Sequence, residues 1–158
     1  MHENDPSVFL IYCRDGNGGI CVEFERKFID GIEWFICNGQ EYRNRYHAID
    51  RLQREYLRSG CRCVWGKASG CWDALWLAEQ YDIRCLVLED CKFRMRQALS
   101  RTARRNAFAV VCRVIICSGA EKCPNLPNAQ VYRADDAGQI PGMLRSLGLF
   151  CAENTNDL

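Results

Sequence analysis

The chain has 158 residues, 48% of them hydrophobic, which is enough for one globular domain with its own core. Its formal net charge of +1 argues against a protein that binds polyanions over a broad surface, because such proteins carry a large basic excess. No apolar run reaches membrane-spanning length, and the polar, acidic start is unlike a signal peptide, so we expect neither a membrane segment nor a secretion signal.

Twelve cysteines could indicate a disulfide scaffold, but their positions favour reduced thiols. Half of them lie inside or at the ends of apolar, strand-like runs, where a cysteine packs as a small hydrophobic residue. These six are Cys13, Cys37, Cys63, Cys85, Cys112 and Cys117. A domain of this length can also build a stable core without disulfide bonds. The sequence therefore predicts a reduced protein of the cytoplasm.

The cysteines and histidines form no pattern that is typical of a metal site. No two cysteines are spaced C-x-x-C. The two histidines, His2 and His47, are not spaced for zinc. We therefore expect neither a metal ion nor a cofactor.

Strand-like and helical segments alternate along the chain, which is typical of an α/β protein whose parallel sheet is covered on both faces. A continuous apolar run predicts the first strand, over residues 8–13. Cys21, Phe24 and Phe28 then recur at helical spacing, and this spacing predicts a helix over 20–29.

The middle of the chain continues this alternation. The run IEWFIC predicts the second strand, over 32–37, and an amphipathic helix is expected over 45–58. The apolar side of that helix would carry Ile49, Leu52, Tyr56 and Leu57. A third strand over 61–65 leads into a helix over 72–80. The inward-facing residues of this second helix would be Ala74, Leu75 and Ala78.

The last part of the chain adds three strands and two helices. A fourth strand is predicted over 83–88, a basic helix over 92–105 and a fifth strand over 109–117. A short sixth strand over 130–133 precedes a last helix over 140–147, which has proline in its first turn. The pattern predicts an α/β fold with a doubly wound, mostly parallel sheet of about six strands.

The turn between the third strand and its helix carries the most specific motif. Gly66 and Gly70 enclose the sequence GKASG, which resembles the nucleophile elbow G-x-S-x-G of the α/β-hydrolase superfamily. In that motif small residues let the strand reverse sharply into the helix. Ala74 and Ala78 fall where helices of this family usually carry alanine. The position of the nucleophilic serine, however, is Ala68.

The resemblance implies a truncated α/β-hydrolase core that forms a single domain over 1–158. The strand before the turn should lie centrally in the sheet, because the turn must open at the carboxyl-terminal edge. The ends of the chain, near 1–6 and 152–158, are expected to be loosely held.

The resemblance also implies a triad in the order Ser, Asp or Glu, His, and this triad is incomplete. No histidine follows His47, and Gln139 stands near the position of the family's histidine. An amide cannot act as a general base at neutral pH. Glu121 could supply the acid, but Ala68 cannot attack a substrate. We therefore expect a catalytically inactive protein.

A working hydrolase or esterase would need a rearranged site with a substitute nucleophile. Ser69 lies one step past the nucleophile position, and Cys71 lies in the first helical turn, where a thiolate is stabilised. A register with Ser69 as nucleophile places Lys67 and Cys71 at the small-residue positions, which is a poor steric fit. A third alternative is a structural or oligomer subunit that exposes a sheet edge.

For an inactive protein of this kind we expect binding in the crevice at the carboxyl ends of the strands. The residues expected to line it are Asn17, Gly18, Lys67, Ala68, Ser69 and Gln139. Lys67 and the main-chain N–H groups at the helix start favour an anion, such as a carboxylate or a phosphate ester. The glycine-rich segment 14–19 could be an anion-binding loop or, if 20–25 is a strand, only a hairpin turn.

The sequence also bears on nucleic acids, membranes and proteins as possible partners. The stretch 92–105 has six basic residues and no acid, but no stacking aromatic residues are interleaved on its basic face. It is more typical of a solvated helix face, with Phe93, Leu99 and Ala103 packed beneath, than of a nucleic-acid surface. The sequence therefore does not favour nucleic acid or a membrane as a partner. A protein partner or a homo-oligomer is compatible with all of these features.

Overall fold

The computed structural model describes residues 6–13, 23–39, 45–68, 70–91, 109–118, 123 and 125–149. The segment 14–19, the predicted basic helix over 92–105 and, apart from Pro6, the predicted loose ends lie outside the described residues.

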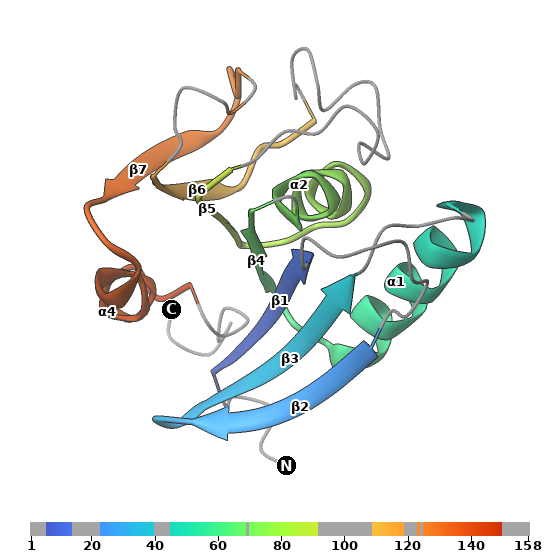
Figure 1. Ribbon diagram of the computed structural model, residues 1–158. Coiled ribbons are helices and arrows are strands. Elements are labelled where there is room, and N and C mark those ends of the chain that lie inside the picture. Colours follow the sequence, from blue (N-terminus) through green and yellow to red (C-terminus); the bar gives the residue numbers. More distant parts are fainter. Residues whose placement is uncertain are drawn as a thin grey trace, which may run out of the picture.

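The described strands form one seven-stranded sheet in the order β2-β3-β1-β4-β5-β6-β7 (Figure 1). The strands are β1 (Ser7–Cys13), β2 (Glu23–Ile29), β3 (Ile32–Gly39), β4 (Cys63–Lys67), β5 (Cys85–Glu89), β6 (Arg113–Cys117) and β7 (Gln130–Ala134). Only β2 runs antiparallel to its neighbour, so the predicted mostly parallel sheet is confirmed. The strand before the glycine turn, β4, is the fourth of the seven, so its predicted central place is confirmed as well.

The prediction of a helix over 20–29 is wrong where the structure describes it, because Glu23–Ile29 is the edge strand β2. Phe24 and Phe28 are four residues apart, an even spacing that also places them on one face of a strand. Asp30 and Gly31, both with positive φ, then close a two-residue turn into β3. This extra strand raises the sheet from the expected six strands to seven. It pairs with β3, so the alternative of a simple hairpin with the first strand does not hold either.

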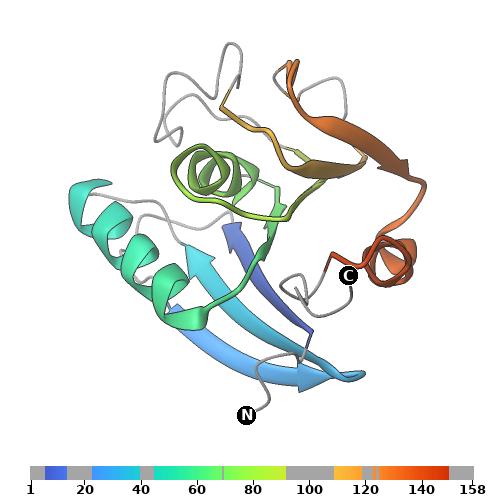
Figure 2. The same ribbon diagram turned by 180° about the vertical axis from the view of Figure 1, so that it is seen from behind.

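Helices cover both faces of the sheet (Figure 1, Figure 2). They are α1 (Arg45–Ser59), α2 (Gly70–Gln80) and α4 (Ile140–Ser146), which follows the short 3₁₀ helix η3 (Ala137–Gln139). Leu52 of α1 and Leu75 of α2 share one buried cluster with one side of the sheet. Ile140 and Leu144 of α4 belong to the cluster on the opposite side. Leu57, predicted on the apolar side of α1, is instead 59% exposed, because it lies one helical step of about 100° beyond the buried Tyr56.

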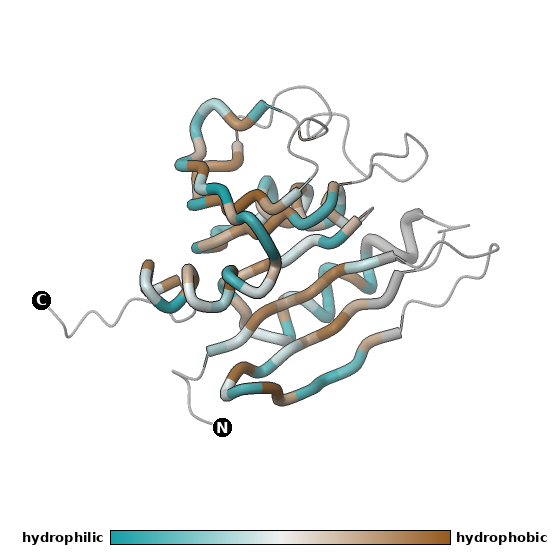
Figure 3. Tube along the Cα trace, turned by 60° about the vertical axis from the view of Figure 1, so that its left-hand side comes forward, coloured by the Kyte–Doolittle hydropathy of each residue, from teal (hydrophilic) through white to brown (hydrophobic). Residues whose placement is uncertain are grey.

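Alternation along the inner strands supplies both halves of the core. In β4, for example, Val64 faces the cluster of α1 and α2, whereas Cys63 and Trp65 face that of α4. Figure 3 shows hydrophobic residues gathered along the inner strands and hydrophilic residues in the middle of β2. None of the described helices has the length and apolar character that a membrane crossing requires.

Candidate functional site

A sharp turn joins the central strand β4 to helix α2, and Ala68 lies at its tip. Ala68 has a φ of 54°, in the left-handed region that non-glycine residues rarely adopt. Its N–H donates to the carbonyl of Glu89 at 3.0 Å, and its own carbonyl accepts from the N–H of Cys71 at 3.2 Å. Two main-chain bonds therefore hold the turn at the carboxyl end of β4. Ser69 lies outside the described residues.

The two glycines of the turn allow α2 to pack against the strands at backbone contact. A Cβ atom on Gly66 would lie 2.6 Å from the Cα of Cys71 and 2.8 Å from the Cβ of Ala74. A Cβ on Gly70 would lie 2.2 Å from the carbonyl oxygen of Ile11, near the end of β1. These approaches leave no space for a side chain, so the strand–turn–helix geometry depends on glycine at both positions.

Cys71, a candidate substitute nucleophile, lies under the turn. Its side chain is fully buried, and its Sγ lies 3.4 Å from the carbonyl oxygens of both Gly66 and Glu89. A nucleophile must reach a bound substrate, whereas this thiol connects β4 and β5 from inside the core. The geometry argues for a packing role.

The strained backbone at Ala68 is repeated after the next two strands of the sheet, β5 and β6. Asp90 directly follows β5 with φ 48°, and Ser118 directly follows β6 with φ 55°. The N–H of Asp90 donates to the carbonyl of Cys117 at 2.8 Å, the counterpart of the bond from Ala68 to the end of β5. A left-handed conformation costs a non-glycine residue about 1–2 kcal/mol. Strain of this kind clusters at binding and catalytic sites, and here it lines the edge where such sheets bind ligands.

We expect Ala68→Gly to raise the free energy of unfolding by about 0.5–1 kcal/mol, because the strain released exceeds the extra chain entropy that glycine loses on folding. Urea denaturation would measure the change. Ala78→Gly, inside α2, is the matched control, and this variant should instead lower the free energy of unfolding by about 1 kcal/mol or more. Equal destabilisation in both variants would show that Ala68 is not strained.

The charges described at this edge are mostly negative. Lys67, the cation expected to attract an anion, has its Nζ 3.6 Å from a carboxylate oxygen of Glu89, which is itself buried. Burial raises the pKa of the Cys117 thiol in the same row. The neighbouring carboxylates of Glu89, Asp136 and Asp135 raise it further. A negative field at the ends of β5 to β7 follows.

Gln139 lies on the same edge but not beside the turn. Its side-chain oxygen accepts from the N–H of Asp135 at 3.1 Å, and Asp136 caps η3 by accepting from the N–H of Gly138 at 2.6 Å. The end of β7 is three strand spacings from Lys67, which is about 14 Å. The structure therefore places two of the expected lining residues far apart on the same edge, Lys67 at its centre and Gln139 near its β7 end. Asn17 and Gly18 lie outside the described residues.

Sequence reasoning overlooked Glu89, Asp90 and Ser118, which the structure places in the same row as the turn. Each is a polar residue at the end of a buried strand. Because the carboxyl ends of parallel strands meet at one edge, that pattern was a usable signal. In the part of the chain that the structure describes, no group of three or more His, Cys, Asp or Glu residues is arranged to hold a metal ion.

The chain was compared with protein-family models and with curated proteins, and neither comparison gave a match.

Proposed function

We propose that this protein is a non-catalytic binding domain with an α/β-hydrolase-like core, which holds a small ligand or a protein partner at the carboxyl-terminal edge of its sheet. The observation that carries the proposal is Ala68, which occupies the strained tip of the turn in place of a nucleophile. A buried central strand, a residue of positive φ and a glycine-packed helix are the features that a nucleophile elbow needs. They support the hydrolase-like interpretation of the sequence.

The turn lacks the two principal groups of a serine hydrolase, the nucleophile and the histidine base. The methyl group of Ala68 has no lone pair, and both histidines of the chain precede the turn in sequence. A serine hydrolase needs a histidine to take the proton of its nucleophile. Gln139, near the position expected for that histidine, uses its amide oxygen to hold a backbone N–H. The elbow geometry is thus kept without the groups that would react.

The charges at this edge bear on the kind of ligand. The expectation that Lys67 attracts an anionic ligand gains no support. Lys67 is paired with Glu89, and Asp135 and Asp136 add negative charge to the same edge. A ligand group that donates hydrogen bonds or carries positive charge fits these carboxylates better.

The alternative of an oligomer subunit that pairs through an exposed sheet edge has less support at β2. Its middle residues Glu25, Arg26 and Lys27 are charged and exposed, and Arg26 pairs with Glu33 of β3. Charged side chains on an edge strand discourage pairing with another chain.

We expect the purified protein to hydrolyse p-nitrophenyl acetate and butyrate no faster than an equal concentration of the unfolded chain, because alanine occupies the nucleophile position and no histidine follows it in the sequence. The release of p-nitrophenol measures this directly. Turnover that disappears in Ser69→Ala or Cys71→Ala would contradict the proposal and identify a substitute nucleophile.

Binding at the edge is tested separately by NMR with a panel of small amines and alcohols. Ligands should shift the amide resonances of Ala68, Asp90 and Ser118, and Ala68→Phe should remove these shifts by filling the tip of the turn. Binding that leaves these three resonances unchanged would place the ligand elsewhere and overturn the proposed site.

A further inference from the structure

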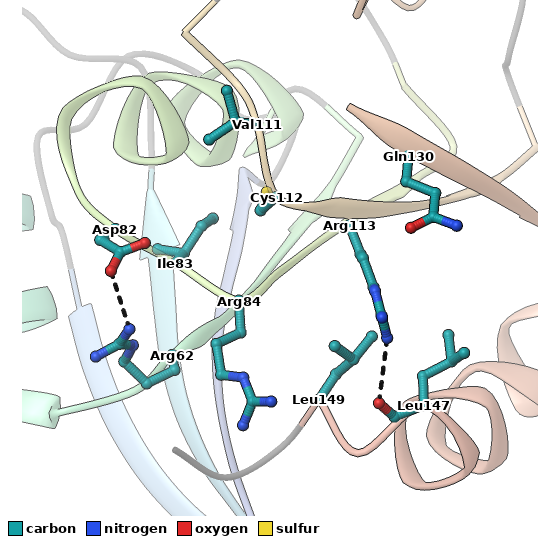
Figure 4. Close-up of a pocket in the computed structure, with 10 residues that line it drawn as sticks. All are labelled: Arg62, Asp82, Ile83, Arg84, Val111, Cys112, Arg113, Gln130, Leu147 and Leu149. Atoms are coloured by element: carbon teal, nitrogen blue, oxygen red, sulfur yellow. Dashed lines mark hydrogen bonds and ion pairs between the residues drawn. The ribbon is translucent and has the colours of Figure 1, made fainter. Parts of the chain in front are cut away.

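A second site candidate lies at the opposite, amino-terminal edge of the sheet. A cavity of about 660 Å³ opens there between the starts of β4 to β7 and the end of α4 (Figure 4). Three arginines contribute to its lining, together with a single acid, Asp82. The volume is in the range typical of small-molecule sites.

The three arginines, Arg62, Arg84 and Arg113, line one pocket because of the register of the sheet. Each lies at or just before the start of one of three adjacent parallel strands. The N–H of Arg84 donates to the carbonyl of Arg62 at 2.7 Å, and the N–H of Arg113 donates to that of Arg84 at 3.4 Å. This continuous backbone ladder sets the three side chains along one edge. Figure 4 shows Arg84 and Arg113 extending from neighbouring strands toward the segment of Leu147 and Leu149.

The positive charge of the pocket exceeds its negative charge. Arg62 pairs with Asp82 at 3.2 Å, but the Asp82 side chain is 92% exposed, so water screens this contact strongly. Arg113 donates one N–H to the carbonyl of Leu147 at 3.4 Å, which fixes its direction. The lining of the pocket therefore contains three guanidinium groups and one carboxylate.

One donor in the pocket also lacks an acceptor. The Nε of Arg62 is buried, and no acceptor lies within hydrogen-bond distance among the described residues. A buried N–H without a partner costs free energy. Beside the arginines, the buried side chains of Ile83 and Leu149 supply apolar walls.

We propose that this pocket binds a small organic anion, whose phosphate or carboxylate group lies among the guanidinium groups of Arg62, Arg84 and Arg113. The planar fork of arginine matches the oxygens of both groups, and the apolar walls would contact the rest of such a ligand. This site is separate from the carboxyl-terminal edge, and the proposal does not rest on the function proposed for that edge.

The test uses inorganic pyrophosphate as the probe, with sodium chloride at matched ionic strength as the reference. Isothermal titration calorimetry on the full chain should show saturable binding of pyrophosphate. Arg84→Gln and Arg113→Gln should each raise the Kd about ten- to a hundredfold, the loss expected for a charge-assisted hydrogen bond. Arg84→Lys keeps the charge but not the fork, so its Kd should lie between those of the wild type and Arg84→Gln.

Two further variants separate this site from other basic positions. Arg54→Gln, an exposed arginine of α1 outside the pocket, is the matched control and should leave the Kd unchanged. Lys67→Gln distinguishes the two edges: an unchanged Kd supports the arginine pocket, and a tenfold loss would move the anion to the carboxyl-terminal edge and overturn the proposal. Absence of saturable binding, or unchanged affinity in Arg113→Gln, would overturn it as well. If Arg84→Gln fails to fold by circular dichroism, Arg113→Gln decides the question.

Discussion

Gly70→Ala is expected to remove a large part of the protein's stability. The added Cβ would lie 2.2 Å from the carbonyl oxygen of Ile11 and 2.7 Å from its carbonyl carbon, and both are backbone atoms that no rotamer change can move. Helix α2 would have to lift off β1, which would expose part of the core around Leu75 and Leu77. Overpacking a well-packed core costs about 1–3 kcal/mol, and a clash with backbone should reach or exceed the upper value. Domains of this kind are stable by only about 5–15 kcal/mol.

The midpoint of urea denaturation measures the loss, and Gly142→Ala is the matched control. Gly142 lies on the exposed side of helix α4, where a Cβ would meet nothing within 4 Å. The same substitution should there raise the free energy of unfolding by about 0.5–1 kcal/mol, because alanine is the better helix former. If the two variants behaved alike, the close seating of α2 on β1 would be wrong.

The strand, turn and helix around Ala68 could be predicted because their determinants are local. A short apolar-leaning run precedes the turn, two glycines mark the turn itself, and Ala74 and Ala78 make a small helix face. The structure shows the consequence of each: β4 is central, both glycines lie at backbone contact, and both alanines are buried. Local pattern and tertiary packing agree here, as they do in sequences that specify one structure.

Strand β2 could not be predicted in the same way, since its pattern is ambiguous. Phe24 and Phe28 satisfy both helical and strand periodicity, and charged residues fill the positions between them. The Asp30–Gly31 pair was the usable signal, because this dipeptide between two strand-like runs favours a hairpin turn. Pairing with β3, which decides the matter, lies outside any local window.

Both candidate sites depend on register, which a single segment does not contain. Asp90 and Ser118 become neighbours of Ala68 only because β4, β5 and β6 are aligned end to end. At the other edge the same alignment brings together Arg62 and Arg84, which are far apart in the sequence. Residue types at strand ends could be predicted, but their assembly into a row required the strand order.

The stability of the protein is expected to fall steeply above about pH 9, because several thiols are buried as neutral groups. Burial raises the pKa of Cys61, and it raises that of Cys112 to about 12. A hydrogen bond with Cys85, together with burial, raises the pKa of Cys63. In the unfolded chain these thiols have a pKa of about 8.5. Below that pH both states are protonated, and these groups add no pH dependence.

Between the unfolded and folded pKa values, the unfolded state releases protons that the folded state keeps, so the free energy of unfolding decreases as the pH rises. Each thiol contributes up to about 1.4 kcal/mol per pH unit, so Cys61, Cys63 and Cys112 together give about 4 kcal/mol per unit. Urea unfolding with reductant present, from pH 7 to 10.5, measures this slope. Cys112→Ala is the control, because it should reduce the slope by one thiol's share whatever it does to stability at neutral pH. A free energy of unfolding that stays constant up to pH 10 would contradict the burial of these thiols, because ionisation in the unfolded chain alone would otherwise have destabilised the fold.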